Sequence, residues 1–285
     1  MSPLRRPLSV LVLPLLLLGC PSVRQDDDDV ADDDAGDDDT AAVEGIFRIG
    51  LVESGDFAYA YVSNPVIPSP WWIPELDIGD CVFHRAVLGL CDPPCTPPEV
   101  CDAHGECVSY PEPISAGDIA VEGLAVDLVL EVGGPYLYYT AVFDPEPADG
   151  ALFAEGDAIE ATAPGDALPT FAVQTQGVAP METGLPCPLE YEGGQPLTVS
   201  WTPAPQGDRV HLELRSGNHG SQFAAVVCET ADDGELVVDA EIVDAYLAEW
   251  RPVELWQLTR YHEGTVVAGE TLVQLWAVTS ASCMW

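Results

Sequence analysis

Hydrophobic and polar residues alternate along much of this chain with the period of two that a half-buried β-strand requires. Residues 197–201 and 210–214 place apolar side chains at every second position, with polar ones between them. Comparable short runs, some of them aromatic, lie at residues 57–61, 126–132, 136–143, 223–228, 236–238, 253–261 and 272–278. Gly, Pro and Asp residues separate the runs, which predicts a mainly β fold of sandwiches or a barrel.

One segment departs from this period. In residues 241–250, apolar side chains recur at the spacing of a helix face, and Asp239 stands where an N-cap residue would. The apolar positions are Ile242, Val243, Tyr246, Leu247 and Trp250. We therefore expect a short helix that crosses between strands.

Gly and Pro residues gather at residues 180–195, which indicates a domain boundary there. On this interpretation residues 45–183 form a first β-rich domain and residues 184–285 a second. The second range, of about 100 residues, has a common size for a β-sandwich. The predicted fold class is thus two β-sandwich-like domains, with a small disulfide-rich insertion at residues 91–107 in the first.

The N-terminus has the three parts of an export signal. Arg5 and Arg6 precede an apolar run at residues 8–18, which is too short to span a bilayer as a helix. The run ends in Leu17-Leu18-Gly19-Cys20, which resembles the lipobox of bacterial lipoproteins. The resemblance implies a signal peptide at residues 1–19, cleavage between Gly19 and Cys20, and lipid on Cys20. An ordinary cleaved signal peptide with a chance cysteine is the alternative.

The same resemblance implies acyl chains such as palmitate on Cys20, and a membrane as a partner through that lipid anchor. It places the protein in the cell envelope, at the outer membrane or cell surface rather than at the inner membrane. No other segment reaches 18 consecutive apolar residues.

An acidic segment follows the cysteine. Residues 20–44 include ten aspartates between positions 26 and 39, a charge density that favours a disordered, extended tether. The segment is interpreted as a spacer. An acidic cluster close after a lipidated cysteine also resembles surface-export signals of some lipoproteins. An ion site is the third alternative, although the spacing of a calcium loop is absent.

The overall charge excludes several classes of function. The formal net charge is −39 and the chain contains no lysine. A nucleic-acid partner requires a basic surface, so we expect none. Docking on anionic lipid headgroups and all lysine-dependent catalysis are likewise disfavoured.

Eight cysteines remain once Cys20 is assigned to lipid, and an exported chain is expected to join them in four disulfides. They are Cys81, Cys91, Cys95, Cys101, Cys107, Cys187, Cys228 and Cys283. Residues 91–107 have the spacing C-x3-C-x5-C-x5-C, which resembles EGF-like cysteine-rich microdomains. That resemblance implies the pairs Cys91–Cys101 and Cys95–Cys107, and the other pairings stay open. Zinc held by Cys95, Cys101, His104 and Cys107 is the alternative; oxidation of thiols after export disfavours it, so no metal is expected.

Catalytic motifs are sparse. The chain has no G-x-S-x-G, H-E-x-x-H or G-x-x-x-x-G-K-[ST] sequence. His211, between two aliphatic residues, is interpreted as an exposed histidine on the polar side of a strand. Ser216 or Ser221 with His219 would make a nucleophile and base only if the fold presented them; the glycines beside them favour a turn.

Trp71 and Trp72 are adjacent and flanked by prolines, which keep them extended and away from a central strand. Such indoles can stack on sugars or bind a protein, and the alternative is that they fill a core. The layout as a whole resembles exported bacterial lipoproteins with an acidic tether, a small cysteine cluster and β-sandwich domains.

The function that these features favour is a non-catalytic binding or structural module of the envelope, with protein or carbohydrate as its partner and no cofactor. A carbohydrate-binding module that uses Trp71 and Trp72 is one alternative, and an exported hydrolase with an unrecognised site is the other.

Overall fold

A nine-stranded sheet runs through the part of the chain that the structure describes. The computed structural model describes residues 45–54, 57–63, 72–86, 91, 93–96, 99–101, 106–109, 113–134, 137–138, 141–143, 151–204, 209–218, 221–249 and 251–285. The predicted signal peptide (1–19) and tether (20–44) lie outside these residues.

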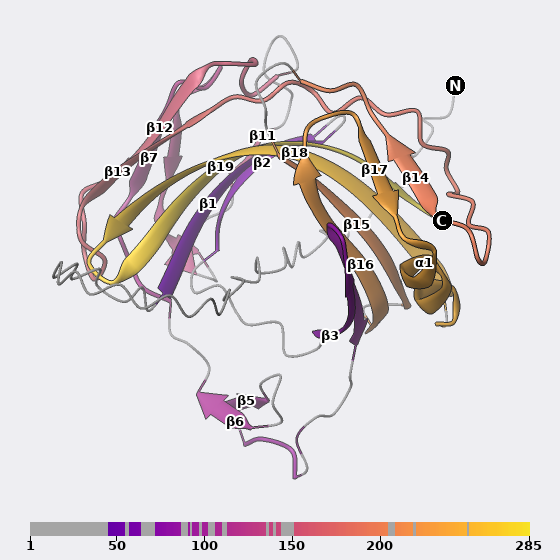
Figure 1. Cartoon of the computed structure of the whole chain (residues 1–285). Coiled ribbons are helices and arrows are strands. Elements are labelled where there is room, and N and C mark those ends of the chain that lie inside the picture. Colours follow the sequence, from indigo (N-terminus) through magenta and orange to yellow (C-terminus); the bar gives the residue numbers. More distant parts are fainter. Residues whose placement is uncertain are drawn as a thin grey trace, which may run out of the picture. The chain divides into compact units, whose positions relative to one another are not determined.

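The strands of the large sheet come from both ends of the described chain (Figure 1). In spatial order they are β11 (Ala141–Phe143), β2 (Phe57–Ser63), β1 (Gly45–Ser54), β19 (Thr271–Met284), β18 (Val253–Ala268), β15 (Arg209–Asn218), β16 (Ser221–Ala231), β4 (Cys81–Ala86) and β3 (Trp72–Ile78). β1 runs parallel to β19, whereas the other strand pairs in the described residues are antiparallel. The parallel pair joins the N-terminal hairpin to the C-terminal one.

A smaller sheet covers one part of the large sheet and encloses a first core. Its order is β13 (Phe171–Gln176), β12 (Ala158–Ala163), β7 (Ile119–Glu122) and β8 (Leu128–Leu130). β13 alternates strictly between buried and exposed positions, as a strand with one solvated face does. Its buried residues, such as Phe171 and Val173, pack against Phe47, Ile49 and Leu275 of the large sheet.

A second core forms over β15, β16, β4 and part of β18. It is covered by β14 (Leu197–Ser200), β17 (Glu235–Val238) and the helix α1 (Ala240–Leu247). The predicted helix is confirmed: the Asp239 side chain caps it by accepting from the Glu241 N–H at 2.8 Å, and Ile242, Val243 and Tyr246 are buried. The remaining strands form two short hairpins, β9 (Val132–Gly134) with β10 (Leu137–Tyr138) and β5 (Glu99–Cys101) with β6 (Cys107–Ser109).

The mainly β fold class with a disulfide-rich insertion is confirmed. The described residues contain two hydrophobic cores, and each of them draws on both predicted ranges. The predicted ranges 45–183 and 184–285 also share the large sheet, because β1 pairs with β19 and β4 pairs with β16. The residues near 180–195 are a connecting segment alongside this sheet.

A buried ion pair fixes that connecting segment. Arg260 of β18 binds the Asp232 carboxylate at 2.6 Å, and neither side chain is more than 1% exposed. The same guanidinium donates to the carbonyl oxygens of Ala179, Pro180 and Thr202. Asp232 also accepts from the indole N–H of Trp201. Because each partner is satisfied several times over, this pair holds residues 179–204 on the sheet.

Candidate functional site

The two cores lie on the same face of the large sheet, and the opposite face is the candidate site. On β18, the even-numbered residues Trp256, Leu258 and Ala268 point to the cores, so the odd-numbered residues point the other way. The side chains of this second face are mostly polar or aromatic, and we call them the polar face. They are Arg48, Tyr61, His211, Glu213, Arg215, Glu229, Thr259, Tyr261, Glu263, Gln274, Trp276 and Ser280.

Trp276 lies at the centre of a stack on this face. The Arg48 guanidinium carbon is 4.1 Å from the Trp276 ring centroid, and the Tyr261 ring stacks on the same indole at 4.9 Å and 14°. Strand register places Arg48 beside Gln274 and Tyr261 beside Val278, on opposite sides of Trp276. Both faces of the indole are therefore covered from within the chain, and its Nε1 atom is buried without a hydrogen-bond partner among the described residues.

Strand register places Tyr61 of β2 across Gly50 from Trp276, and the glycine leaves room for the Tyr61 ring. Tyr61 pairs with Gly50, and a Cβ at Gly50 would lie 2.1 Å from the Tyr61 ring. A side chain at this position would force the Tyr61 ring to move. Burial raises the pKa of Tyr61 to about 12, so its hydroxyl remains protonated at neutral pH.

The Gln274 side-chain amide bridges Arg48 and Glu263 through two hydrogen bonds. Arg48 Nε donates to Gln274 Oε1 at 2.9 Å, and Gln274 Nε2 donates to Glu263 Oε1 at 2.6 Å. Arg48 is 3% exposed, so the Gln274 amide and the indole face together stabilise its buried charge.

A second chain of hydrogen bonds leads to His211. The Tyr261 hydroxyl donates to Glu229 Oε2 at 2.9 Å, and Glu229 Oε1 lies 2.6 Å from His211 Nδ1. Burial by itself would lower the pKa of His211, but the hydrogen bond and charge of Glu229, with Glu213 nearby, outweigh it and raise that pKa. The carboxylate fixes Nδ1 as the donor, so Nε2 of the neutral ring is an acceptor.

The interpretation of His211 as an exposed strand residue is therefore wrong. His211 is 4% exposed, because β15 is a central strand whose two faces are both buried. The neighbouring Glu213 and Arg215 are also buried and form an ion pair with each other. Polar residues tolerate this burial because they neutralise one another across and along the strands.

Five atoms of the polar face are buried and have no hydrogen-bond partner in the described structure. They are Tyr61 Oη, His211 Nε2, Thr259 Oγ1, Trp276 Nε1 and Ser280 Oγ. Ser280, Thr259 and His211 stand directly opposite one another on β19, β18 and β15, so three of the five atoms follow one row across the sheet. Six further buried atoms without partners lie on other described residues, namely His84, Tyr191, Ser216, Tyr246, Arg251 and Glu254. The row of Ser280, Thr259 and His211 is distinguished by the register that places its three members side by side, which makes it a candidate binding site.

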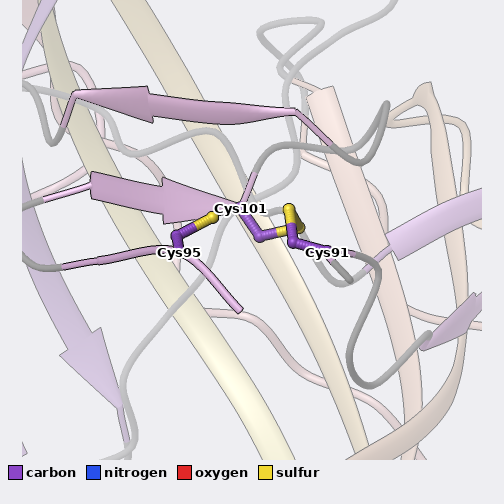
Figure 2. Close-up of side chains that lie close together, drawn as sticks. All are labelled: Cys91, Cys95 and Cys101. Atoms are coloured by element: carbon purple, nitrogen blue, oxygen red, sulfur yellow. A yellow bond between two sulfur atoms is a disulfide. The ribbon is translucent and has the colours of Figure 1, made fainter. Parts of the chain in front are cut away.

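The cysteine insertion offers no free thiolate. The sulfur atoms of Cys91, Cys95 and Cys101 lie within 4.8 Å of one another (Figure 2). They are oxidised in the structure, where Cys91 is bonded to Cys101 and Cys95 to Cys107, the pairs that the EGF-like resemblance implies. The other two disulfides are Cys81–Cys228 and Cys187–Cys283. A zinc site would need at least two of these bonds to be reduced.

The remaining predicted site residues are placed as follows. Gly19, Cys20, Trp71, His104 and His219 lie outside the described residues. Trp72 is half-buried on β3, where its ring meets His84 edge-on with centroids 6.5 Å apart. Ser216 is buried on the core face of β15 and therefore does not reach the polar face.

In the described residues no helix is both long and apolar enough to cross a bilayer. No protein-family model matches the chain, and neither a curated protein nor a solved structure matches it.

Proposed function

We propose that this chain is a lipid-anchored envelope lipoprotein whose polar face binds a ligand without catalysing its conversion. The observation that carries the proposal is the set of buried atoms without partners on Tyr61, His211, Thr259, Trp276 and Ser280. A ligand that hydrogen-bonds to these atoms would relieve the cost of their burial.

Sequence features and covalent bonds support the anchored, exported part of the proposal. Leu17-Leu18-Gly19-Cys20 has the order of a lipobox, and eight further cysteines form four disulfides. Disulfides on this scale form in oxidising compartments. A membrane partner through lipid and an outer-membrane or surface location follow from the lipobox and from the acidic segment behind it.

Binding is favoured over hydrolysis because no hydroxyl that the structure describes near His211 is hydrogen-bonded to its free ring nitrogen. A base and nucleophile are expected to share a hydrogen bond, with the base oriented by a third group. Glu229 orients His211, but both Thr259 Oγ1 and His211 Nε2 lack partners, so no hydrogen bond joins them. The ligand contact predicted at Trp71 and Trp72 is moved in this proposal to the polar face.

Anchoring is tested by replacing the proposed lipid acceptor. The Cys20→Ser variant is expected to leave the membrane fraction in cell fractionation, because no second lipobox precedes another cysteine. The Cys91→Ser variant is the control and should stay membrane-bound. Retention of the Cys20→Ser protein at the wild-type level would contradict the anchor.

Ligand binding is tested by thermal unfolding of the soluble full-length Cys20→Ser protein. Neutral oligosaccharides, acidic oligosaccharides, fatty acids and short peptides are added separately, because a ligand of the folded state raises Tm. At least one class should raise the Tm of this protein but not that of the same chain with Thr259→Val and Ser280→Ala. Equal shifts in both proteins, or no shift with any class, would overturn the proposed site.

A further inference from the structure

We infer that the ligand of the polar face is a neutral carbohydrate of more than one sugar ring; this deepens the proposed function and rests on it. The inference comes from the chemistry of the atoms that are left without partners and from the way in which the charged groups on the face are already compensated.

The charged side chains of the polar face are matched within the chain. Glu213 pairs with Arg215, and Glu229 bonds to His211 and Tyr261. The charge of Arg48 is connected through Gln274 to Glu263. A charged ligand would therefore bring an uncompensated charge into a buried site, which is strongly unfavourable.

The atoms left over are neutral and of mixed type. The Trp276 indole N–H only donates, whereas the hydroxyls of Tyr61, Thr259 and Ser280 both donate and accept. His211 Nε2 accepts when the imidazole is neutral and donates when it is protonated. Sugar hydroxyls also donate and accept, so a carbohydrate can satisfy all five atoms. An acyl chain would leave each of them unpaired.

Aromatic side chains suit the apolar parts of a sugar. Tyr261 stacks on Trp276, and Tyr59, which points to the same face of β2 as Tyr61, has its ring centroid 6.1 Å from that of Tyr61. Aromatic rings combined with a few fixed polar groups are the usual lining of a site that binds an uncharged, partly apolar molecule.

The spacing of the atoms sets the size of the ligand. Trp276 and Ser280 are four residues apart on β19, which corresponds to about 13 Å along a strand. The row from Ser280 through Thr259 to His211 crosses three neighbouring strands, or about 10 Å. A single sugar ring cannot reach both ends, so we infer an oligosaccharide.

The test is calorimetric titration of the full-length Cys20→Ser protein with defined tetrasaccharides. The neutral probes are cellotetraose, maltotetraose and chitotetraose, and the acidic probe is tetragalacturonate. We expect binding of at least one neutral probe, weakened at least tenfold by Thr259→Val and by Ser280→Ala. The controls are Thr265→Val and Ser282→Ala, at exposed positions on the same face of β18 and β19, which should keep wild-type affinity.

The outcomes separate this inference from the proposed function. Loss of binding in Thr259→Val and Ser280→Ala but not in the controls supports both. If only tetragalacturonate binds, and the same two variants weaken that binding, the inference of a neutral ligand is overturned while the polar face remains a binding site. If no probe binds, or if the variants and controls behave alike, the carbohydrate inference fails and the proposed function loses its support.

Discussion

Thr259 and Ser280 each hold a buried hydroxyl that bonds to nothing in the described structure, on a face of the sheet whose charged groups are paired. Such an atom costs folding free energy, so its presence is better explained by a ligand than by stability. The Arg260–Asp232 pair differs in this respect, because its polar atoms are hydrogen-bonded within the protein and stabilise the fold.

Replacing Thr259 by valine should stabilise the ligand-free protein. The substitution keeps the side-chain shape and removes a buried, unpaired hydroxyl, so the free energy of unfolding should rise by about 1 kcal/mol. Urea denaturation measures the change, with Thr265→Val as the exposed control. A loss of stability in Thr259→Val would instead indicate a structural hydrogen bond.

The pH response of His211 should depend on Glu229. The raised pKa of His211 exists because Glu229 outweighs burial, so Glu229→Gln should lower that pKa below its ordinary value of 6.5. NMR titration of the imidazole measures both proteins. Since the folded pKa is raised, the stability that the pair contributes is fully present below pH ~6.5 and is lost as pH rises through the raised pKa. An unchanged pKa in Glu229→Gln would contradict the network.

Arg260→Met should destabilise the fold severely. It leaves the buried Asp232 carboxylate without its cation, which costs on the order of 3–5 kcal/mol. Arg85→Met removes the exposed pairs to Glu75 and Glu249 and should cost less than about 1 kcal/mol. Chemical denaturation of both variants measures the two changes in the free energy of unfolding. Similar decreases would contradict the larger contribution expected of the buried pair.

A prediction from sequence rests on the neighbours of a residue along the chain, so it cannot show which distant residues will contact that residue. His211 between Val210 and Leu212 resembles an exposed strand residue, yet Glu229, 18 residues away, lies opposite it on β16. The pattern of period two correctly assigned His211 to the face opposite Leu212. It could not show that this face is buried as well, since burial depends on partners distant in sequence.

At the scale of elements, the sequence predicted the features that depend on adjacent residues but not the pairing of strands that are distant in the chain. The helix at residues 240–247 followed from its spacing and from the Asp239 cap, which are properties of adjacent residues. The parallel pairing of β1 with β19 joins residues more than 200 positions apart, and no turn or periodicity encodes it. The Gly- and Pro-rich stretch near residues 180–195 consequently predicted a boundary between ranges that share one sheet.

The disulfide between β4 and β16 should contribute more stability than those of the insertion. Cys81 and Cys228 are direct register partners, 147 residues apart in sequence, whereas Cys91 and Cys101 are separated by 10. In the chain-entropy model the longer loop is worth about 5 kcal/mol and the shorter about 3 kcal/mol. Thermal unfolding of Cys81→Ala/Cys228→Ala and Cys91→Ala/Cys101→Ala double variants compares them. A larger loss in the second variant would contradict the order.

At the scale of the whole molecule, export, anchoring and binding form one proposal. A lipobox and an acidic segment can be proposed from sequence because targeting signals are contiguous in the chain, whereas the polar face is assembled from six strands and was not predicted. Trp71 and Trp72 were predicted as a ligand contact because they are adjacent aromatic residues between prolines. The tryptophan at the centre of the candidate site is Trp276, which lies in a run predicted only as a strand.

The most direct test of the central claim, that the polar face is a ligand site, is the NMR signal of the Trp276 indole N–H. Trp201 and Trp256 provide internal controls, because their indoles already donate to Asp232 and to the Pro186 carbonyl oxygen. On titration with neutral tetrasaccharides, the Trp276 resonance, assigned through Trp276→Phe, is predicted to shift while those of Trp201 and Trp256 stay in place. An unmoved Trp276 resonance in the presence of a sugar that demonstrably binds the protein would contradict the account.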